Sequence, residues 1–239
     1  MADSDEATEG GIRRRFRSQI RGEVKEAALR QLSEGGPQAL SINAIAKELG
    51  VSGPALYRYF ASRDDLLTEL VTDAYHDFAV ALEAGTPPAG DVPPADRLRA
   101  FAAAYRRWAT TEPHRYRLLF AAPLPGYDAQ SERLVNASRE GMQVLLDVLA
   151  PLTPAGDEDG VHPLRGQLQQ WSDSRELPGI TPRLALRAVT TWSRLHGLAS
   201  LEIESNFASM GLDPELIFEA EVDALLDSPA QLGRGEPPR

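Results

Sequence analysis

The sequence predicts an all-α protein, and three observations lead to that prediction. Apolar residues recur at helical spacing in every strongly patterned segment, and no segment alternates at the period of two that a half-buried strand requires. Serine, threonine or aspartate precedes several of these segments, as N-cap residues do. Clusters of glycine and proline separate them.

Composition excludes several classes of protein. The chain has no cysteine, which excludes disulfides, thiolate metal ligands and a cysteine nucleophile. No apolar run approaches the roughly 20 residues of a membrane span. The acidic, polar N-terminus does not resemble a secretory signal. We therefore expect a cytoplasmic protein with no membrane partner.

Charge is divided unevenly along the chain. The net charge is −10, yet residues 11–63 carry ten Lys/Arg against four acids. Residues 64–239 carry fifteen bases against twenty-seven acids. A basic surplus confined to one short segment favours contact with phosphate there, and an ordinary solvated face is the alternative.

Four helices are predicted in the N-terminal third. An apolar stripe from Ile20 to Leu32 ends at Gly35-Gly36-Pro37. Ser41 and Ser52 each precede a short helix, and Gly50 lies between them. A longer helix is predicted to follow Ser62, whose capping box is completed by Asp65.

A loop is expected at residues 85–94. Six further helices should follow it, at residues 95–110, 114–121, 129–150, 161–174, 181–204 and 214–227. Thr181-Pro182 and Asp213-Pro214 combine an N-cap with a proline at the first helical position. We expect both ends of the chain, residues 1–12 and 229–239, to be disordered tails.

The segment from Ile42 to Tyr59 has the spacing of a helix-turn-helix. Ala46 is small where two helices would cross, and Gly50 supplies the positive φ of the turn. Ile45, Leu49, Val51 and Leu56 would form the small core between the helices. A plain pair of helices would show a similar pattern, so the spacing alone leaves that alternative open.

Two neighbouring runs stand out in and after this segment: Gly50-Val51-Ser52-Gly53-Pro54-Ala55-Leu56-Tyr57-Arg58-Tyr59-Phe60 and Ser62-Arg63-Asp64-Asp65-Leu66-Leu67. Together they closely resemble the signature of the tetracycline-repressor (TetR) family. Tyr59 stands where histidine is usual in that family, and Arg63 where lysine is usual. The resemblance implies a three-helix helix-turn-helix DNA-binding domain over residues 13–62. It also implies a helical ligand-sensing and dimerisation domain over residues 63–228.

The same resemblance implies which residues contact double-stranded operator DNA. Ser41, Tyr57, Tyr59 and Arg63 would contact phosphates, and Asn43 would read a base edge. The start of the recognition helix would approach the major groove through Ser52, Gly53, Pro54 and Ala55, with Arg58 also in the DNA-contacting set.

Four arginines before the first helical stripe, Arg13, Arg14, Arg15 and Arg17, have two interpretations. They would follow the DNA backbone or enter a minor groove, or they form a solvated basic tail.

Trp192-Ser193-Arg194-Leu195-His196-Gly197 resembles the Trp-His-Gly stretch of one class of TetR C-terminal domains. That resemblance implies a cavity for a small effector and a homodimer. We expect Tyr105, Trp108 and Trp192 to line the cavity, with ordinary core packing as the alternative for each aromatic residue.

The sequence therefore predicts a ligand-responsive repressor that is released from a pseudo-palindromic operator by a small apolar or aromatic effector. The alternative is a helix-turn-helix protein with no effector that serves as an architectural or interaction module. No enzyme is predicted, because the chain carries no nucleophile elbow, phosphate loop, dinucleotide fingerprint or zinc-protease motif. No cofactor or metal is predicted; Asp73, His76 and Asp77 have ligand-like spacing but fit a solvated helix face as well.

Overall fold

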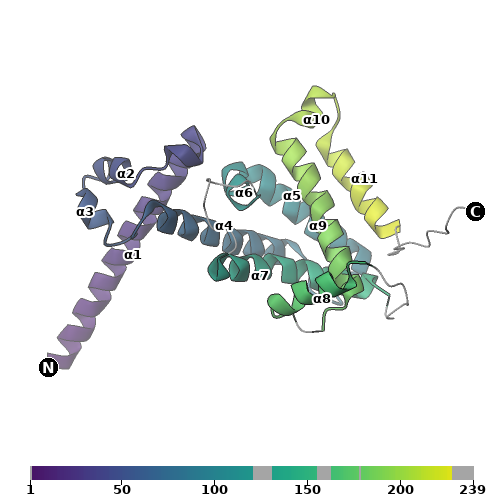
Figure 1. Cartoon of the computed structure of the whole chain (residues 1–239), viewed down its shortest axis with the longest axis horizontal. Coiled ribbons are helices and arrows are strands. Elements are labelled where there is room, and N and C mark those ends of the chain that lie inside the picture. The colour runs from purple at the N-terminus through teal and green to yellow at the C-terminus, as the bar shows by residue number, and fades with distance from the viewer. Residues whose placement is uncertain (1, 121–130, 155–162, 178, 228–239) are drawn as a thin grey trace, which may run out of the picture. The chain divides into compact units, whose positions relative to one another are not determined.

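The computed structural model describes residues 2–120, 131–154, 163–177 and 179–227, and for residues 2–14 and 37 it describes the backbone alone (Figure 1). Every regular element in these ranges is a helix, which confirms the all-α prediction. None of these helices combines the length and apolarity of a membrane span. The predicted C-terminal tail, residues 229–239, lies outside the described residues.

The chain divides into two compact units. Unit 1 comprises residues 1–73 and 117–129, and unit 2 comprises residues 74–116 and 130–239. We expected a boundary at residues 62/63, but the division falls inside helix α4 (Arg63–Gly85). The first half of α4 buries Leu66, Leu67 and Leu70 in unit 1, so these residues belong with the preceding helices.

Unit 1 contains α1 (Ala2–Gly35), α2 (Ile42–Glu48), α3 (Gly53–Leu56) and the start of α4. Helix α1 includes residues 2–12, for which we predicted a disordered tail. The helix ends where predicted, at Gly35-Gly36. The core of unit 1 consists of apolar side chains that are at most 7% exposed: Val24, Ala27, Ala28, Leu32, Leu40, Ile42, Ile45, Ala46, Leu56, Phe60, Leu66, Leu67, Leu70 and Val71.

The predicted N-caps are all present. The hydroxyl of Ser41 accepts from the Ala44 N–H at 3.3 Å, that of Ser52 from Ala55 at 3.3 Å, and that of Ser62 from Asp65 at 3.0 Å. The Asp65 carboxylate in turn accepts from the Ala61 N–H at 2.9 Å. These bonds satisfy donors that the first turn of a helix leaves without partners. In unit 2, Thr181 caps the next-to-last long helix in the same way, at 3.2 Å from the Leu184 N–H.

Unit 2 contains the rest of α4, α5 (Pro94–Thr111), the start of α6 (Pro113–Phe120), α7 (Glu132–Leu149), α8 (Arg165–Ser174), α9 (Pro182–Ile203), α10 (Asn206–Ser209) and α11 (Pro214–Asp227). Helix α9 packs against α5, α7, α8, α10 and α11, and Figure 1 shows α9 and α11 side by side. The sequence did not predict α10. Its N-cap residue, Ser205, has a left-handed φ of 60° and its side chain makes no capping hydrogen bond. The sequence before α10 therefore lacks the capping pattern that predicted several other helices.

The apolar face of α9 from Leu184 to Ala199 is buried except at Trp192, which is half-buried. Leu184 is 7% exposed, and Ala188, Leu195 and Ala199 are fully buried. The opposite face ends in Leu201, which is 42% exposed. Ser193 on that face is exposed as well, so α9 is covered on one side along its length and on the other side only near its start.

The turn between α2 and α3 depends on Gly50, whose φ is +67°. Gly50→Ala would place a side chain in that conformation and should lower the free energy of unfolding by about 1–2 kcal/mol. The control is Gly22→Ala in the middle of α1, where a Cβ meets nothing within 4 Å and alanine should stabilise by about 0.5–1 kcal/mol. Urea unfolding of both variants measures the two effects, and equal effects would exclude this role for Gly50.

Candidate functional site

Helices α2 and α3 form the helix-turn-helix in unit 1. The Val51 N–H donates to the Ala46 carbonyl at 3.0 Å across the turn, which places the two helices against each other at the small Ala46 side chain. Ile45 and Leu56 are buried between them. Leu49 and Val51, expected in the same small core, are only half-buried.

Half of the ten residues predicted to contact DNA are exposed, and all five of these lie on or directly next to this pair of helices. Asn43, Ser52, Pro54, Tyr57 and Arg58 are exposed, with 46% of Tyr57 accessible. Ser41, Gly53 and Ala55 are half-buried. The hydroxyls of both cap serines accept a backbone hydrogen bond and retain a proton that can be donated to a phosphate oxygen.

Asn43 and Gly53 lie against each other. A Cβ built on Gly53 would lie 3.1 Å from the Asn43 Oδ1 atom, which is a tight contact. Glycine at the first position of α3 therefore leaves room for the Asn43 amide at the exposed face of the helix-turn-helix. An exposed amide at this point can pair with both edge groups of an adenine in the major groove.

Tyr59 and Arg63 follow α3 and are half-buried. The Arg17 guanidinium lies over the Tyr59 ring, 5.8 Å from its centroid, so α1 reaches this residue. Arg15 and Arg17 are exposed, while the side chains of Arg13 and Arg14 lie outside the described residues.

Two residues that the sequence did not single out also belong to this region. Arg21 of α1 donates to the Tyr59 carbonyl oxygen at 2.8 Å, and Glu69 of α4 forms an ion pair with Arg21. Arg21 and Glu69 are 48 residues apart in the chain, so no local sequence pattern could have identified them as a pair.

In unit 2, aromatic rings form a connected series that we call the aromatic chain: Trp108, Phe78, Tyr105, Tyr116, His196 and Trp192. Phe78 lies 4.8 Å from Trp108 and 5.2 Å from Tyr105 between ring centroids. Tyr105 and Tyr116 are 6.3 Å apart, and Tyr116 stacks on His196 at 5.6 Å. His196 stacks on Trp192 at 5.5 Å. All three residues predicted to line a cavity therefore belong to one aromatic chain.

The aromatic chain also contains a series of hydrogen bonds. The Tyr105 and Tyr116 hydroxyl oxygens are 3.4 Å apart, and the Tyr116 hydroxyl lies 2.6 Å from Nδ1 of His196. Burial lowers the pKa of His196, so its ring is neutral at pH 7, and the ring tautomer decides whether Nδ1 accepts from the Tyr116 hydroxyl or donates to it. Burial likewise raises the pKa of Tyr105 well above its ordinary value and keeps the hydroxyl protonated. The aromatic chain thus combines apolar rings with a few uncharged polar groups.

Of the three residues with metal-like spacing, Asp73 and Asp77 are engaged in ion pairs and His76 lies within hydrogen-bond distance of a carboxylate. Asp73 accepts from Lys25 at 2.7 Å, His76 Nδ1 lies 3.1 Å from a Glu140 carboxylate oxygen, and Asp77 pairs with Arg115. No group of three or more potential metal-ligating side chains occurs within the part of the chain that the structure describes. His196 lies on α9 and forms a hydrogen bond with the Tyr116 hydroxyl.

Comparison with known proteins covers both units. The family described as bacterial regulatory proteins, tetR family, matches residues 25–70, and the family described as tetracyclin repressor-like, C-terminal domain, matches residues 98–225. The HTH-type transcriptional regulator Rv1816 of Mycobacterium tuberculosis is 33% identical over 222 residues, which cover 90% of this chain and 94% of that protein.

Solved structures agree with these matches. The crystal structure of the regulatory protein SCO4313 is 40% identical, with a TM-score of 0.72, and the match covers 90% of this chain and 98% of that one. A TetR variant from Acinetobacter baumannii, solved in complex with minocycline, has a TM-score of 0.52 at 16% identity, covering 86% of this chain and 93% of that one. The second likeness concerns the fold alone.

Proposed function

Because the chain belongs to the TetR family of bacterial regulatory proteins, we propose that it is a ligand-responsive repressor that binds a pseudo-palindromic operator as a homodimer. The chain is a transcriptional regulator with a DNA-binding helix-turn-helix, and it is not an enzyme. The proposal adds the direction of regulation, the symmetry of the site and the response to a small molecule.

The observation that carries the proposal is the capped pair of helices α2 and α3, with Asn43 and Tyr57 exposed on it. It lies in the segment that holds the chain's basic surplus, while residues 64–239 are acidic. DNA would be attracted to the basic segment and repelled by the acidic remainder. A helix-turn-helix places the N-terminal residues of its second helix in the major groove, which here are Ser52 to Ala55.

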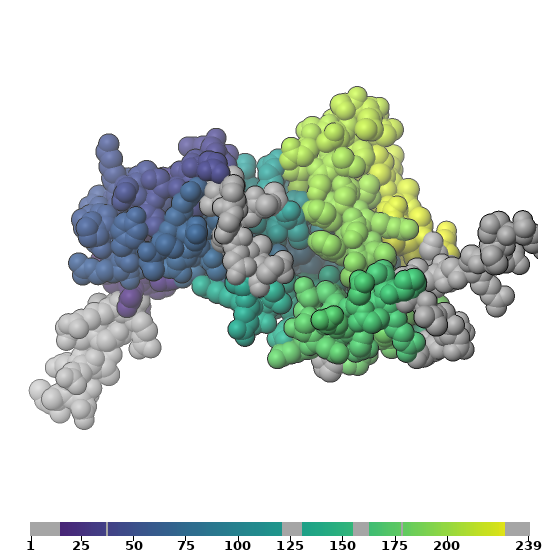
Figure 2. All heavy atoms as spheres, viewed as in Figure 1, coloured from purple at the N-terminus to yellow at the C-terminus, as the bar shows by residue number. Residues whose placement is uncertain are grey.

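A second copy of the chain is the partner we propose for the C-terminal helices. Four large apolar side chains are exposed between the end of α9 and α11: Leu201 at 42%, Met210 at 62%, Leu212 at 49% and Leu216 at 62%. This part of the surface is uncovered in Figure 2 (yellow-green). One helix-turn-helix offers too few contacts for specific affinity, and a dimer would place two of them on successive half-sites.

The effector we propose is an apolar or aromatic molecule, neutral or cationic, that binds at the aromatic chain. Ligand sites are lined mainly by apolar and aromatic side chains, with a few polar groups that orient the ligand. The hydroxyl of Tyr116 and the ring of His196 are suitable polar groups. The acidic surplus of residues 64–239 would slow the entry of an anion. The ligand would release DNA to the extent that it prefers a conformation that does not fit the operator.

The DNA-binding part of the proposal is tested by selecting duplexes from a random pool and comparing Asn43→Ala with Arg63→Ala. Asn43→Ala should change the selected sequence, because a base contact contributes about 1–3 kcal/mol of discrimination. Arg63→Ala should weaken all duplexes alike and reduce the slope of log affinity against log salt by about one unit. If Asn43→Ala selects the wild-type sequence, Asn43 does not read a base.

The dimer is tested by sedimentation of Leu216→Asp and, as a control, of Val80→Asp, which alters an exposed apolar residue of α4. Leu216→Asp should weaken self-association at least tenfold, because burying a leucine side chain contributes about 1.5–3 kcal/mol. Val80→Asp should sediment as the wild type does. A monomeric wild-type protein at micromolar concentration, with and without the selected duplex, would refute the homodimer.

The effector site is tested by titrating neutral and cationic polycyclic compounds, minocycline among them, into the protein–DNA complex. Trp192→Ala should raise the concentration for half release at least tenfold, about 1.4 kcal/mol, and leave DNA binding intact. Trp171→Ala is the matched control, because Trp171 packs with Leu168 and Arg175 outside the aromatic chain. Equal release by wild type and Trp192→Ala would place the ligand elsewhere.

A further inference from the structure

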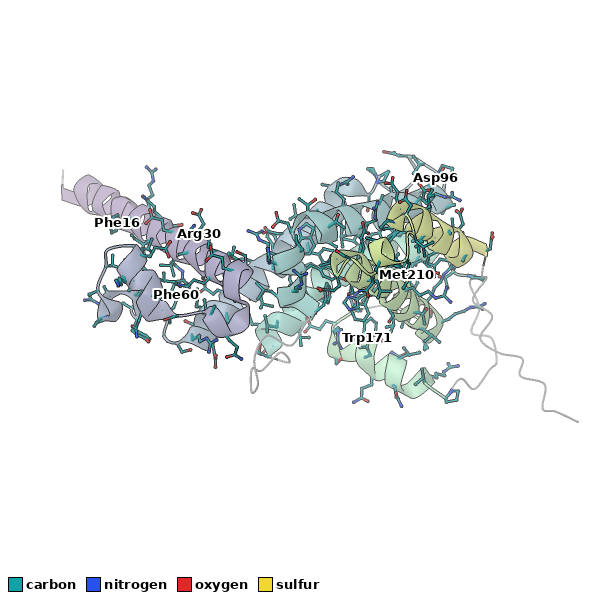
Figure 3. The ribbon with its side chains drawn as sticks, turned by 90° about the horizontal axis from the view of Figure 1, so that it is seen from above. Phe16, Arg30, Phe60, Asp96, Trp171 and Met210 are labelled. Carbon is teal, nitrogen blue, oxygen red and sulfur yellow. The ribbon has the colours of Figure 1, made fainter. Side chains whose placement is uncertain are left out.

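The segment that follows the recognition helix is held by one side chain of α1. Nη1 of Arg21 donates to the main-chain carbonyl of Tyr59 at 2.8 Å. The same guanidinium lies over the ring of Phe60, 4.7 Å from its centroid. Phe60, labelled in Figure 3, is fully buried, so Arg21 contacts both the backbone and the buried anchor of the segment that follows α3.

Arg21 is oriented in turn by a buried carboxylate of α4. Glu69 is 7% exposed, and its Oε1 atom pairs with Nη2 of Arg21. Its Oε2 atom lies 3.2 Å from the Lys25 ammonium, which also bonds Asp73 at 2.7 Å. A buried carboxylate is stable only when it is paired, and Glu69 has two cationic partners on successive turns of α1.

The geometry requires arginine. Its planar fork directs one nitrogen to the Tyr59 carbonyl and the other to Glu69, while its face covers the Phe60 ring. Lysine would keep the charge but presents a single ammonium that cannot make these three contacts together. Arg21 is also turned inward by Glu69, and 32% of its side chain is exposed.

We propose that Arg21 is a positioning residue for DNA recognition, oriented by Glu69, and that it acts by fixing the backbone of the segment that follows α3 and not by binding a phosphate. This inference rests on the proposed DNA-binding function. With the Tyr59 carbonyl anchored, the rings of Tyr57 and Tyr59 keep their places relative to α1. Without it, α3 and the residues after it are held by the Ser52 cap and by the burial of Leu56 and Phe60.

An electrostatic role and a positioning role of Glu69 predict opposite effects of Glu69→Gln on the affinity for DNA. If charge alone mattered, Glu69→Gln would remove a negative charge from a DNA-binding unit and strengthen binding to every duplex. If Glu69 orients Arg21, the same substitution weakens binding to the preferred duplex. The isosteric change leaves the shape of the side chain unaltered, so the sign of the effect separates the two explanations.

The experiment measures the dissociation constants of wild type, Glu69→Gln and Arg21→Lys for two duplexes of equal length. One is the duplex selected by the wild-type protein, and the other is a scrambled version of it. Both variants should bind the selected duplex at least tenfold more weakly and lose most of their preference over the scrambled one. Arg21→Lys should show an unchanged salt slope, since its charge is kept.

Arg30 and Glu48 provide matched controls in the same unit. Arg30, labelled in Figure 3, pairs with Glu48 at 2.6 Å, and both side chains are about half exposed. Arg30→Lys and Glu48→Gln make the same chemical changes at the surface. Both should bind the selected duplex as the wild type does, or slightly more tightly in the case of Glu48→Gln.

Hydrogen exchange without DNA supplies a second readout. Amides of residues 57–62 should exchange faster in Arg21→Lys than in wild type or Arg30→Lys, because their anchor is lost. If Glu69→Gln fails to fold, Arg21→Lys decides the matter alone. Arg21→Lys with wild-type affinity and exchange, or a folded Glu69→Gln that binds more tightly, would overturn the inference. If the wild-type protein selects no duplex, the proposed function fails, and the exchange measurement still tests the anchor.

Discussion

A recognition helix of four residues cannot stabilise itself. Forming the first turn of a helix orders several residues for one hydrogen bond, so an isolated α3 would not persist in water. Its conformation depends on its surroundings: the Ser52 cap, the positive φ of Gly50, and the burial of Leu56. The rest of unit 1 can be understood as the support that this short helix requires.

The local features of this support could be predicted from the sequence, because each is encoded within a few residues. Ser41, Ser52 and Ser62 precede the helices that they cap, and Gly50 stands alone between two apolar runs. Exposure is also partly predictable, since helical spacing determines which side of a short helix is buried, and half of the ten residues predicted to contact DNA are exposed.

The long-range features could not be predicted. Arg21, Tyr59 and Glu69 meet only after α1 and α4 have packed, and neither helix shows in its sequence which charged residue faces the other. Two arginines of α9 are similar. Arg187 bonds the Leu152 carbonyl and Arg194 pairs with Glu221, and no local pattern in the sequence shows either contact. Tertiary contacts decide whether an exposed charge is solvated or structural.

All tryptophan residues of the protein lie in one of its two units. Trp108, Trp171 and Trp192 are the three tryptophans of the chain, and all belong to unit 2. Intrinsic tryptophan fluorescence therefore reports on unit 2 alone. The chain has no cysteine, so one thiol introduced on an exposed residue of α1 would be its only site for a thiol-reactive dye. Events in the two units can then be followed in one sample through two separate emission signals.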